Sequence, residues 1–205
     1  MRHVIDDDQH LRIDGLGVGD HCRDVDLGRQ EAAAELLAGH LDEPRDVGGE
    51  PLLHTKFKEI NRLLPEYAFR KVLFTNAVLL SEELVGSLNV NEIQVSVDGI
   101  ETGHDALRGK GTFKKAMRGL RLAAQTGHDI SVATMVHSMN LNDFEEMKKI
   151  FKGMGIRNWT VDVPSPEGNL RDNPLFRLSP EIAGGYLRYG FGGGLHGGGE
   201  GFACG

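Results

Sequence analysis

From residue 48 onward, the hydrophobic positions of the chain follow two rhythms in turn, one typical of strands and one typical of helices. The clearest strand pattern is "NEIQVSVDG", in which Ile93, Val95 and Val97 alternate with polar residues. Short apolar runs of similar length predict three further strands, so the expected strands are 70–75, 91–99, 129–136 and 158–163.

Segments with helical spacing lie between these strands. One helix is expected around residues 57–64, before the first strand, and another over 81–88, where Ser81 is a suitable cap. A third carries an apolar stripe from Phe113 to Ala124, and a fourth is expected to begin at Asn142 as its cap. Strands that alternate with helices predict an α/β fold with a parallel sheet, which closes into an open sheet or a partial (βα) barrel.

The two ends of the chain do not follow this pattern. Residues 1–47 contain acidic patches and glycines with little periodicity, apart from the helix-forming stretch "RQEAAAELLAGHL". The last segment, "GGYLRYGFGGGLHGGGEGFACG", is so rich in glycine that we expect it to be flexible. The sequence therefore predicts an atypical segment at 1–47, a βα barrel at 48–166 and a flexible extension at 167–205.

Composition narrows the class of protein. The 205 residues suffice for one domain with extensions, and 23 basic against 30 acidic residues give a net charge of −7. Neither a basic patch for nucleic acid nor an apolar run of membrane-spanning length is present, and the N-terminus is too acidic for a signal peptide. We therefore expect a cytoplasmic protein with no nucleic-acid or membrane partner.

The stretch "VGGEPLLH" at residues 47–54 is either a turn or a seat for a ligand, because Gly-Gly and Glu-Pro both mark turns. Polar residues recur where the expected strands end, and in a parallel βα fold ligands bind at that edge. Each of them alone fits ordinary turn chemistry, but their recurrence at one edge predicts a ligand site. These residues are Thr75, Asn76, Ser96, Asp98, Thr134, His137, Asn140 and Asp162.

Five segments in order resemble the radical S-adenosylmethionine (SAM) superfamily over roughly residues 47–170: "GGEPLLH", "FTNAVLL", "IQVSVDGIETGHDALRGKGTFKKAMRGLRLAAQTG", "ISVATMV" and "WTVDVPSPEGN". Within that superfamily they are most similar to the SPASM-type maturases of peptides and tetrapyrroles, which carry a C-terminal cluster-binding extension. The resemblance implies a partial (βα) barrel with SAM across the carboxyl ends of the strands.

The resemblance also implies the residues that contact the cofactor. Gly48, Gly49 and Glu50 match the segment that holds the amino group of the SAM methionine, where backbone carbonyls and a carboxylate suit an ammonium. Thr75 and Ser96 match family positions at the cofactor, and Asp98 lies beside Ser96 on the same face of the strand.

The cysteines depart from the family pattern. The Cys-x-x-x-Cys-x-x-Cys triad that holds a 4Fe–4S cluster is absent, since Cys22 is the sole cysteine upstream of Gly48 and one thiolate cannot carry a cluster. His21 and Asp26 are conceivable substitutes, but an ordinary surface turn is the better interpretation. Cys204 matches an early ligand of an auxiliary cluster in the extension, and Ala77 replaces the usual glycine after Thr-Asn.

We therefore expect a truncated chain, which lacks the cysteine triad at one end and most of the cluster-binding extension at the other. Residues 1–47 are expected to be either frame-shifted or divergent. Two functions remain open. One is a radical SAM enzyme that uses SAM, a 4Fe–4S cluster and an electron donor protein to abstract hydrogen from a peptide or tetrapyrrole. The other is a SAM-binding or partner-binding module without a cluster, or a nonfunctional fragment. In the loop "GIETGHDALRGKG", His104 and Arg108 either contact a ligand or are solvated.

Overall fold

The computed structural model describes residues 50–163, 174–176 and 178–192. Its strands are β1 (Val72–Thr75), β2 (Glu92–Ser96), β3 (Asp129–Met135) and β4 (Asn158–Asp162). Its helices are α2 (Phe57–Leu63), α3 (Glu82–Ser87), α4 (Glu101–Arg108), α5 (Thr112–Ala124), α6 (Phe144–Gly153) and α7 (Pro180–Gly184). Short 3-10 turns complete the order: η1 (Pro51–Leu53), η2 (Leu64–Glu66), η4 (Pro174–Phe176) and η5 (Leu187–Tyr189).

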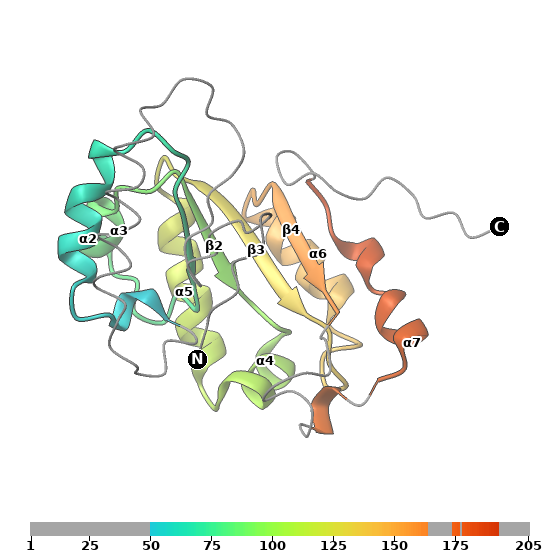
Figure 1. The fold of residues 1–205 in the computed structure, drawn as a ribbon. Helices are drawn as coiled ribbons and strands as arrows, with labels where there is room; N and C mark the ends of the chain where they lie inside the picture. Colours follow the sequence, from blue (N-terminus) through green and yellow to red (C-terminus); the bar gives the residue numbers. More distant parts are fainter. Residues whose placement is uncertain (1–49, 164–173, 177, 193–205) are drawn as a thin grey trace, which may run out of the picture.

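The four strands form one parallel sheet in the order β1-β2-β3-β4, so each strand lies beside its neighbour in sequence (Figure 1). This confirms the predicted α/β fold with parallel strands. A sheet of this kind brings the carboxyl ends of its strands to one edge, which is where the loops that follow β1, β2 and β3 meet.

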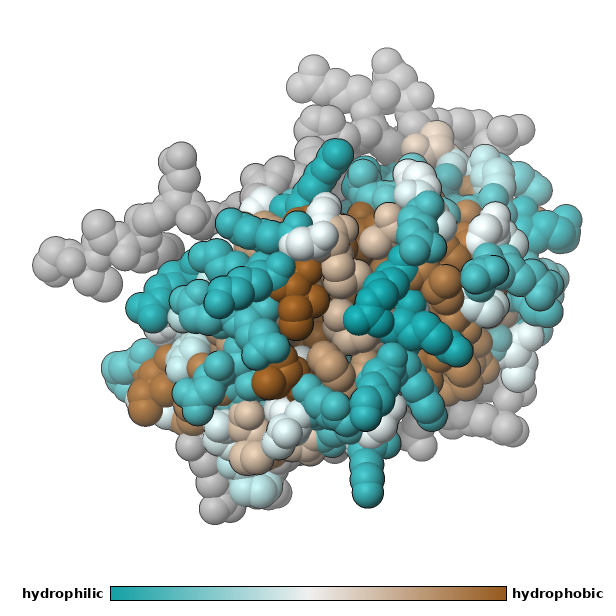
Figure 2. Space-filling view, turned by 180° about the vertical axis from the view of Figure 1, so that it is seen from behind, coloured by the Kyte–Doolittle hydropathy of each residue, from teal (hydrophilic) through white to brown (hydrophobic). Residues whose placement is uncertain are grey.

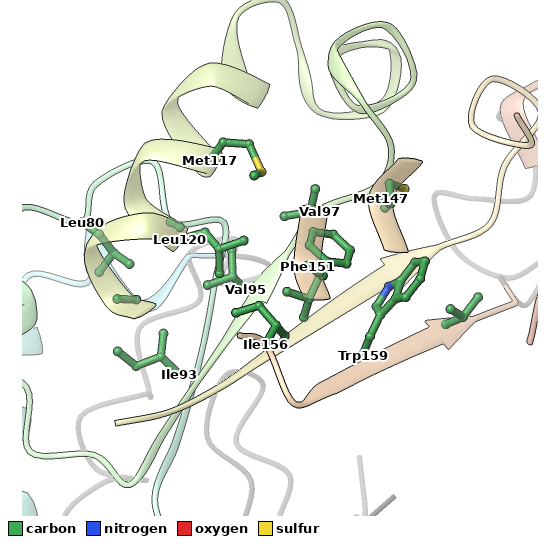
Figure 3. Close-up of a cluster of buried hydrophobic side chains, with 14 of the residues drawn as sticks. Leu80, Ile93, Val95, Val97, Met117, Leu120, Met147, Phe151, Ile156 and Trp159 are labelled. Carbon is green, nitrogen blue, oxygen red and sulfur yellow. The ribbon is translucent and has the colours of Figure 1, made fainter. Parts of the chain in front are cut away.

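One face of the sheet carries the hydrophobic core. Ile93 and Val95 of β2 lie beneath Met117 and Leu120 of α5, and Trp159 of β4 packs beside Phe151 of α6 (Figure 3). The alternate residues of the same strands, among them Gln94 and Ser96, point to the opposite face and remain partly exposed. We call this opposite face the polar face of the sheet.

Two local predictions were wrong. Residues 101–108 form helix α4 rather than part of a loop, because His104 is buried and Gly103 packs closely against Asp143, contacts that its glycine-interrupted sequence does not reveal. Helix α6 begins after Asp143, not Asn142, and Asp143 gives it no side-chain cap. The Asp143 carboxylate instead accepts a hydrogen bond from the backbone N–H of Ile100 at 2.9 Å.

Residues 186–191 of the C-terminal extension pack beside β4, the outer strand of the described sheet, and against helix α6. Tyr186 and Tyr189 lie against Phe144 of α6, with ring centroids 4.7 and 5.2 Å apart, and Phe191 stacks edge-on against Trp159. The expected flexibility of residues 167–205 stays a prediction. Between residues 186 and 191, however, aromatic side chains supply buried contacts that the glycine content conceals.

The surface seen from behind is mostly hydrophilic, with hydrophobic residues visible between hydrophilic ones (Figure 2). None of the helices in the described part of the chain is both long and apolar enough to cross a membrane.

Candidate functional site

Glu50 closes the turn that leads into the first described helix. Its Oε1 atom accepts hydrogen bonds from the Thr75 hydroxyl at 2.8 Å and from the backbone N–H of Leu52 at 3.3 Å. Its Oε2 atom accepts one from the backbone N–H of Asn76 at 2.7 Å. Glu50 and Thr75, which the sequence placed at one site, are therefore in direct contact at the carboxyl end of β1.

The loop after β1 is held in an unusual backbone conformation. Ala77 has φ of 59°, in the left-handed region that glycine favours, and it is fully buried. Its N–H donates to the Thr75 hydroxyl at 3.0 Å. Gly119 of α5 lies so close that an added Cβ would overlap the Ala77 carbonyl oxygen. Ala77 stands out in the sequence as a replacement for glycine, whereas the one local signal of Gly119 is a glycine within a helical apolar stripe.

Asp98 is the centre of a second buried network, just beyond β2. Its Oδ2 atom forms an ion pair with Arg108 Nε at 2.5 Å. Its Oδ1 atom accepts a hydrogen bond from the backbone N–H of Met135 at 2.7 Å. Its carbonyl oxygen accepts hydrogen bonds from His137 at 3.0 Å and from the Asn140 amide at 2.9 Å. With both carboxylate oxygens engaged, Asp98 joins the ends of β2 and β3, and its contact with a cofactor stays a prediction.

Two buried histidines flank this network in defined neutral forms. The Nδ1 atom of His104 accepts the backbone N–H of Asp98 at 3.1 Å. The Nδ1 atom of His137 accepts the backbone N–H of Met139 at 3.3 Å, which leaves its Nε2 atom to donate to the Asp98 carbonyl. Burial lowers the pKa of both rings, since it disfavours the charged form. His104 is thus a structural residue rather than a solvated loop residue.

Ser96 and Asp162 differ from these satisfied groups. Both lie on the polar face of the sheet near the carboxyl ends of their strands, and neither side chain has a hydrogen-bond partner among the described residues. Partial desolvation, followed by the nearby charge of Asp98, raises the pKa of the Asp162 carboxyl, although Asp162 as a whole remains exposed. Within the described part of the chain, these two side chains therefore remain available to a ligand.

The six predicted cofactor residues fall into separate groups. Gly48 and Gly49 lie outside the described residues, Glu50 contacts Thr75, and Asp98 follows Ser96 by two positions. The register pairs Thr75 with Val95, so the Thr75 side chain shares the core face of the sheet, whereas Ser96 lies on the polar face. A single cavity that joins all four described residues stays a prediction, since no described contact links the two networks.

A 4Fe–4S cluster does not fit the cysteines of this chain. The sequence contains two cysteines, Cys22 and Cys204, whereas the family triad needs three thiolates. Both cysteines lie outside the described residues, so the metal-ligand role predicted for Cys204 stays a prediction. Among the residues that the structure describes, no group of three or more His, Cys, Asp or Glu side chains is placed to hold a metal ion.

The two buried histidines predict a pH-dependent stability. Their folded pKa values are lowered, so below about pH 6.5 the unfolded chain binds more protons than the folded chain, and stability falls as the pH decreases. Each histidine contributes a slope of up to about 1.4 kcal/mol per pH unit within its window. Urea denaturation between pH 5 and 8 measures this slope.

His104→Gln should flatten the pH slope, whereas His54→Gln, at a residue near the surface, should leave it unchanged. Desolvation raises the pKa of the Asp143 and Asp162 carboxyls, so the folded chain holds these protons more tightly than the unfolded chain. At lower pH these two groups therefore increase stability as the pH falls, which opposes the histidine effect. The histidine effect is therefore sought above pH 5. A wild-type curve that is flat from pH 5 to 8 would contradict this prediction.

Comparison with known proteins agrees with the fold and the ordered motifs. The family model described as "Radical SAM superfamily" matches residues 18–151, beginning within the segment treated above as atypical. The chain is 31% identical over 165 residues to the AdoMet-dependent heme synthase of Methanosarcina barkeri, covering 72% of this chain and 47% of that protein. It is 34% identical over 119 residues to the GTP 3′,8-cyclase of Synechocystis sp., covering 56% of this chain and 36% of that protein.

A solved structure shares the fold. Native anSMEcpe with bound AdoMet superposes with a TM-score of 0.53 at 22% identity, covering 75% of this chain and 48% of that one. The four parallel strands with their covering helices therefore form part of a radical SAM-like barrel. The chain belongs to the radical SAM superfamily. It spans about a third to a half of the length of the curated relatives first matched, between 33% and 47%.

Proposed function

We propose that this chain is the SAM-binding part of an enzyme that reductively cleaves SAM and abstracts hydrogen from a peptide or tetrapyrrole-type substrate. The observation that carries the proposal is the contact of Glu50 with Thr75 and Asn76 at the carboxyl end of β1. This contact fixes the turn that follows Gly48 and Gly49 at the edge where parallel βα folds bind ligands.

Within this proposal the residues have different tasks. The backbone of Gly48 and Gly49 and the carboxylate of Glu50 face the amino group of SAM, while Thr75 holds Glu50 in place. Ser96 supplies a hydroxyl that no described residue engages, and Asp98 keeps the end of β2 in position through Arg108 and Met135. In the family the radical chemistry would come from SAM and a cluster, with an electron donor protein as partner; this chain lacks the three thiolates for that cluster, so its described residues are assigned only to binding and positioning SAM.

The cysteine content favours a second candidate for the chain as it stands. With two cysteines, it is a SAM-binding or partner-binding module without a cluster, or a nonfunctional fragment. Anaerobic reconstitution with iron and sulfide separates the two candidates. Broad visible absorption would support the enzyme, and its absence would support the module.

The substrate class rests on the resemblance to the SPASM-type branch. The relatives described above are named for different reactions, one as a GTP 3′,8-cyclase and the other as an AdoMet-dependent heme synthase. Their names therefore leave the peptide or tetrapyrrole class as a proposal for this chain. Cytoplasmic localisation is likewise a proposal.

We expect weak SAM binding by the purified, cluster-free chain. Without an open iron site, binding relies on hydrogen bonds from groups such as Ser96, each contributing on the order of 1 kcal/mol. Titration calorimetry, extended by NMR titration to millimolar SAM, measures the affinity. Low-micromolar binding would contradict the expectation, and no binding even at millimolar SAM would favour the nonfunctional fragment.

A pair of serine variants tests the location of the site. Ser96→Ala should weaken SAM binding about fivefold, the loss expected for one hydrogen bond. Ser87→Ala is the matched control, because its hydroxyl bonds locally to the Leu84 carbonyl on the surface of α3. Equal SAM affinity in the two variants would remove Ser96 from the proposed site.

A further inference from the structure

Helix α5 presents a uniformly basic surface to solvent. Four of its residues are exposed, and all four are lysine or arginine: Lys114, Lys115, Arg118 and Arg121. Their spacing of three or four positions places them on one side of the helix, which we call the basic face of α5. The other side of the helix carries its apolar residues into the core of the sheet.

Most of this charge is unpaired within the described part of the chain. Lys114 forms an ion pair with Glu101 at 2.8 Å, whereas the other three cations form none with any residue that the structure describes. The sequence has no acidic residue between Asp105 and Asp129, so α5 has no carboxylate of its own. Neighbouring like charges on a helix repel one another, so the basic face favours an acidic partner.

The acidic charge of the protein is concentrated elsewhere. Residues 1–49, which we call the acidic segment, contain 5 basic and 12 acidic residues, a net charge of −7. Residues 50–205 contain 18 of each kind, so they have no net charge. The whole net charge of the protein therefore belongs to the acidic segment.

The acidic segment joins the described fold beside α5. Glu50, the residue that follows it, bonds to the Thr75 hydroxyl and to the backbone N–H of Asn76. In the same loop, Ala77 lies against Gly119 on the buried side of α5. A helix is about 10–12 Å across and an extended residue spans about 3.3–3.6 Å, so a few residues reach from this loop to the basic face. The nearest acidic residues of the segment are Asp42, Glu43 and Asp46.

We propose that the acidic segment docks on the basic face of α5 of the same molecule. Charge complementarity selects this partner, and the point of entry beside Ala77 gives the segment a high effective concentration at the helix. The proposal needs neither SAM nor a cluster, so it stands apart from the proposed function. Because the charges are exposed, the contact weakens as the salt concentration rises.

Carbodiimide cross-linking of the full chain at low salt is the first test, since it joins a lysine amine directly to a neighbouring carboxylate. We expect mass spectrometry to find links within one molecule between the acidic segment and Lys115. The link from Lys114 to Glu101 shows that the reaction has worked. Lys149, exposed on α6, is the matched control and should not link to the acidic segment.

Tryptic cleavage of the acidic segment after Arg23 and Arg29 is the second test. The double variant Arg118→Gln with Arg121→Gln should be cleaved there about fivefold faster than the wild type at low salt, as expected for the loss of two exposed ion pairs. High salt should speed cleavage of the wild type in the same way.

The control for this variant removes two exposed charges from helix α2, Lys58→Gln with Arg62→Gln, and should be cleaved at the wild-type rate. Equal cleavage in both double variants would overturn the proposal. It would also be overturned if the acidic segment linked to Lys149 as often as to Lys115. Links that join two molecules would overturn it too, by assigning the basic face to a second copy.

Discussion

Replacing Asp98 by alanine should destabilise the folded chain by about 3 kcal/mol, since it leaves a backbone N–H and a guanidinium without their shared partner. The Asp98 side chain is 1% exposed and bonds to both Arg108 and Met135. Arg108 is one third exposed, so water can hydrate its guanidinium in the variant. The loss of stability should therefore lie at the lower end of the range for a broken buried ion pair. Urea denaturation at pH 7.5 measures the change.

The control for this variant is a surface ion pair. Lys114 and Glu101 lie 2.8 Å apart, but both side chains are more than half exposed, so Glu101→Gln should change stability little or not at all. An Asp98→Ala variant as stable as Glu101→Gln would mean that the network around Asp98 does not hold the ends of β2 and β3 together.

Gly119→Ala should also destabilise the chain strongly, by about 3 kcal/mol, because the new methyl group has no space. Its Cβ would overlap the Ala77 carbonyl oxygen and approach the Ala77 Cβ to 2.9 Å. Ala77 is fully buried and is fixed by its hydrogen bond to Thr75, so the loop cannot move away without disturbing Glu50. The midpoint of urea denaturation should fall accordingly.

Gly86→Ala is the matched control, because Gly86 also lies in a helix but has nothing within 4 Å of its added Cβ. The variant should be slightly more stable than the wild type, by about 0.5–1 kcal/mol from helix propensity. Adding Ala77→Gly to Gly119→Ala should restore part of the loss, since it removes one clashing atom but leaves the carbonyl in place. If Gly119→Ala were as stable as Gly86→Ala, the close contact of α5 with the loop would be disproved.

Both predictions concern the same edge of the sheet, where the two networks prepare separate parts of the candidate site. Glu50, Thr75 and Ala77 fix the end of β1, and Asp98 with Arg108 fixes the end of β2. Rigid support of this kind places ligand-contacting groups at defined positions, so changes in it should affect stability and SAM binding together.

The sequence by itself determined the strands, the parallel order and the edge that carries polar residues. Ile93, Val95 and Val97 alternate with polar positions because one face of the sheet is buried, and this physical cause operates within a few residues of the chain. The Gly-Gly-Glu segment and the ordered motifs likewise lie within short stretches, which is why the family could be recognised from them.

The tertiary structure alone decided which polar residues are satisfied and which remain open. The bond of Asp143 to Ile100 and the closeness of Gly119 to Ala77 join residues that are 42 or 43 positions apart, so no local pattern reveals them. The same holds for the bridge between Phe191 and Trp159, which joins residues 32 positions apart. Burial and hydrogen bonding depend on which elements meet in space, and that is settled only when the helices pack on the sheet.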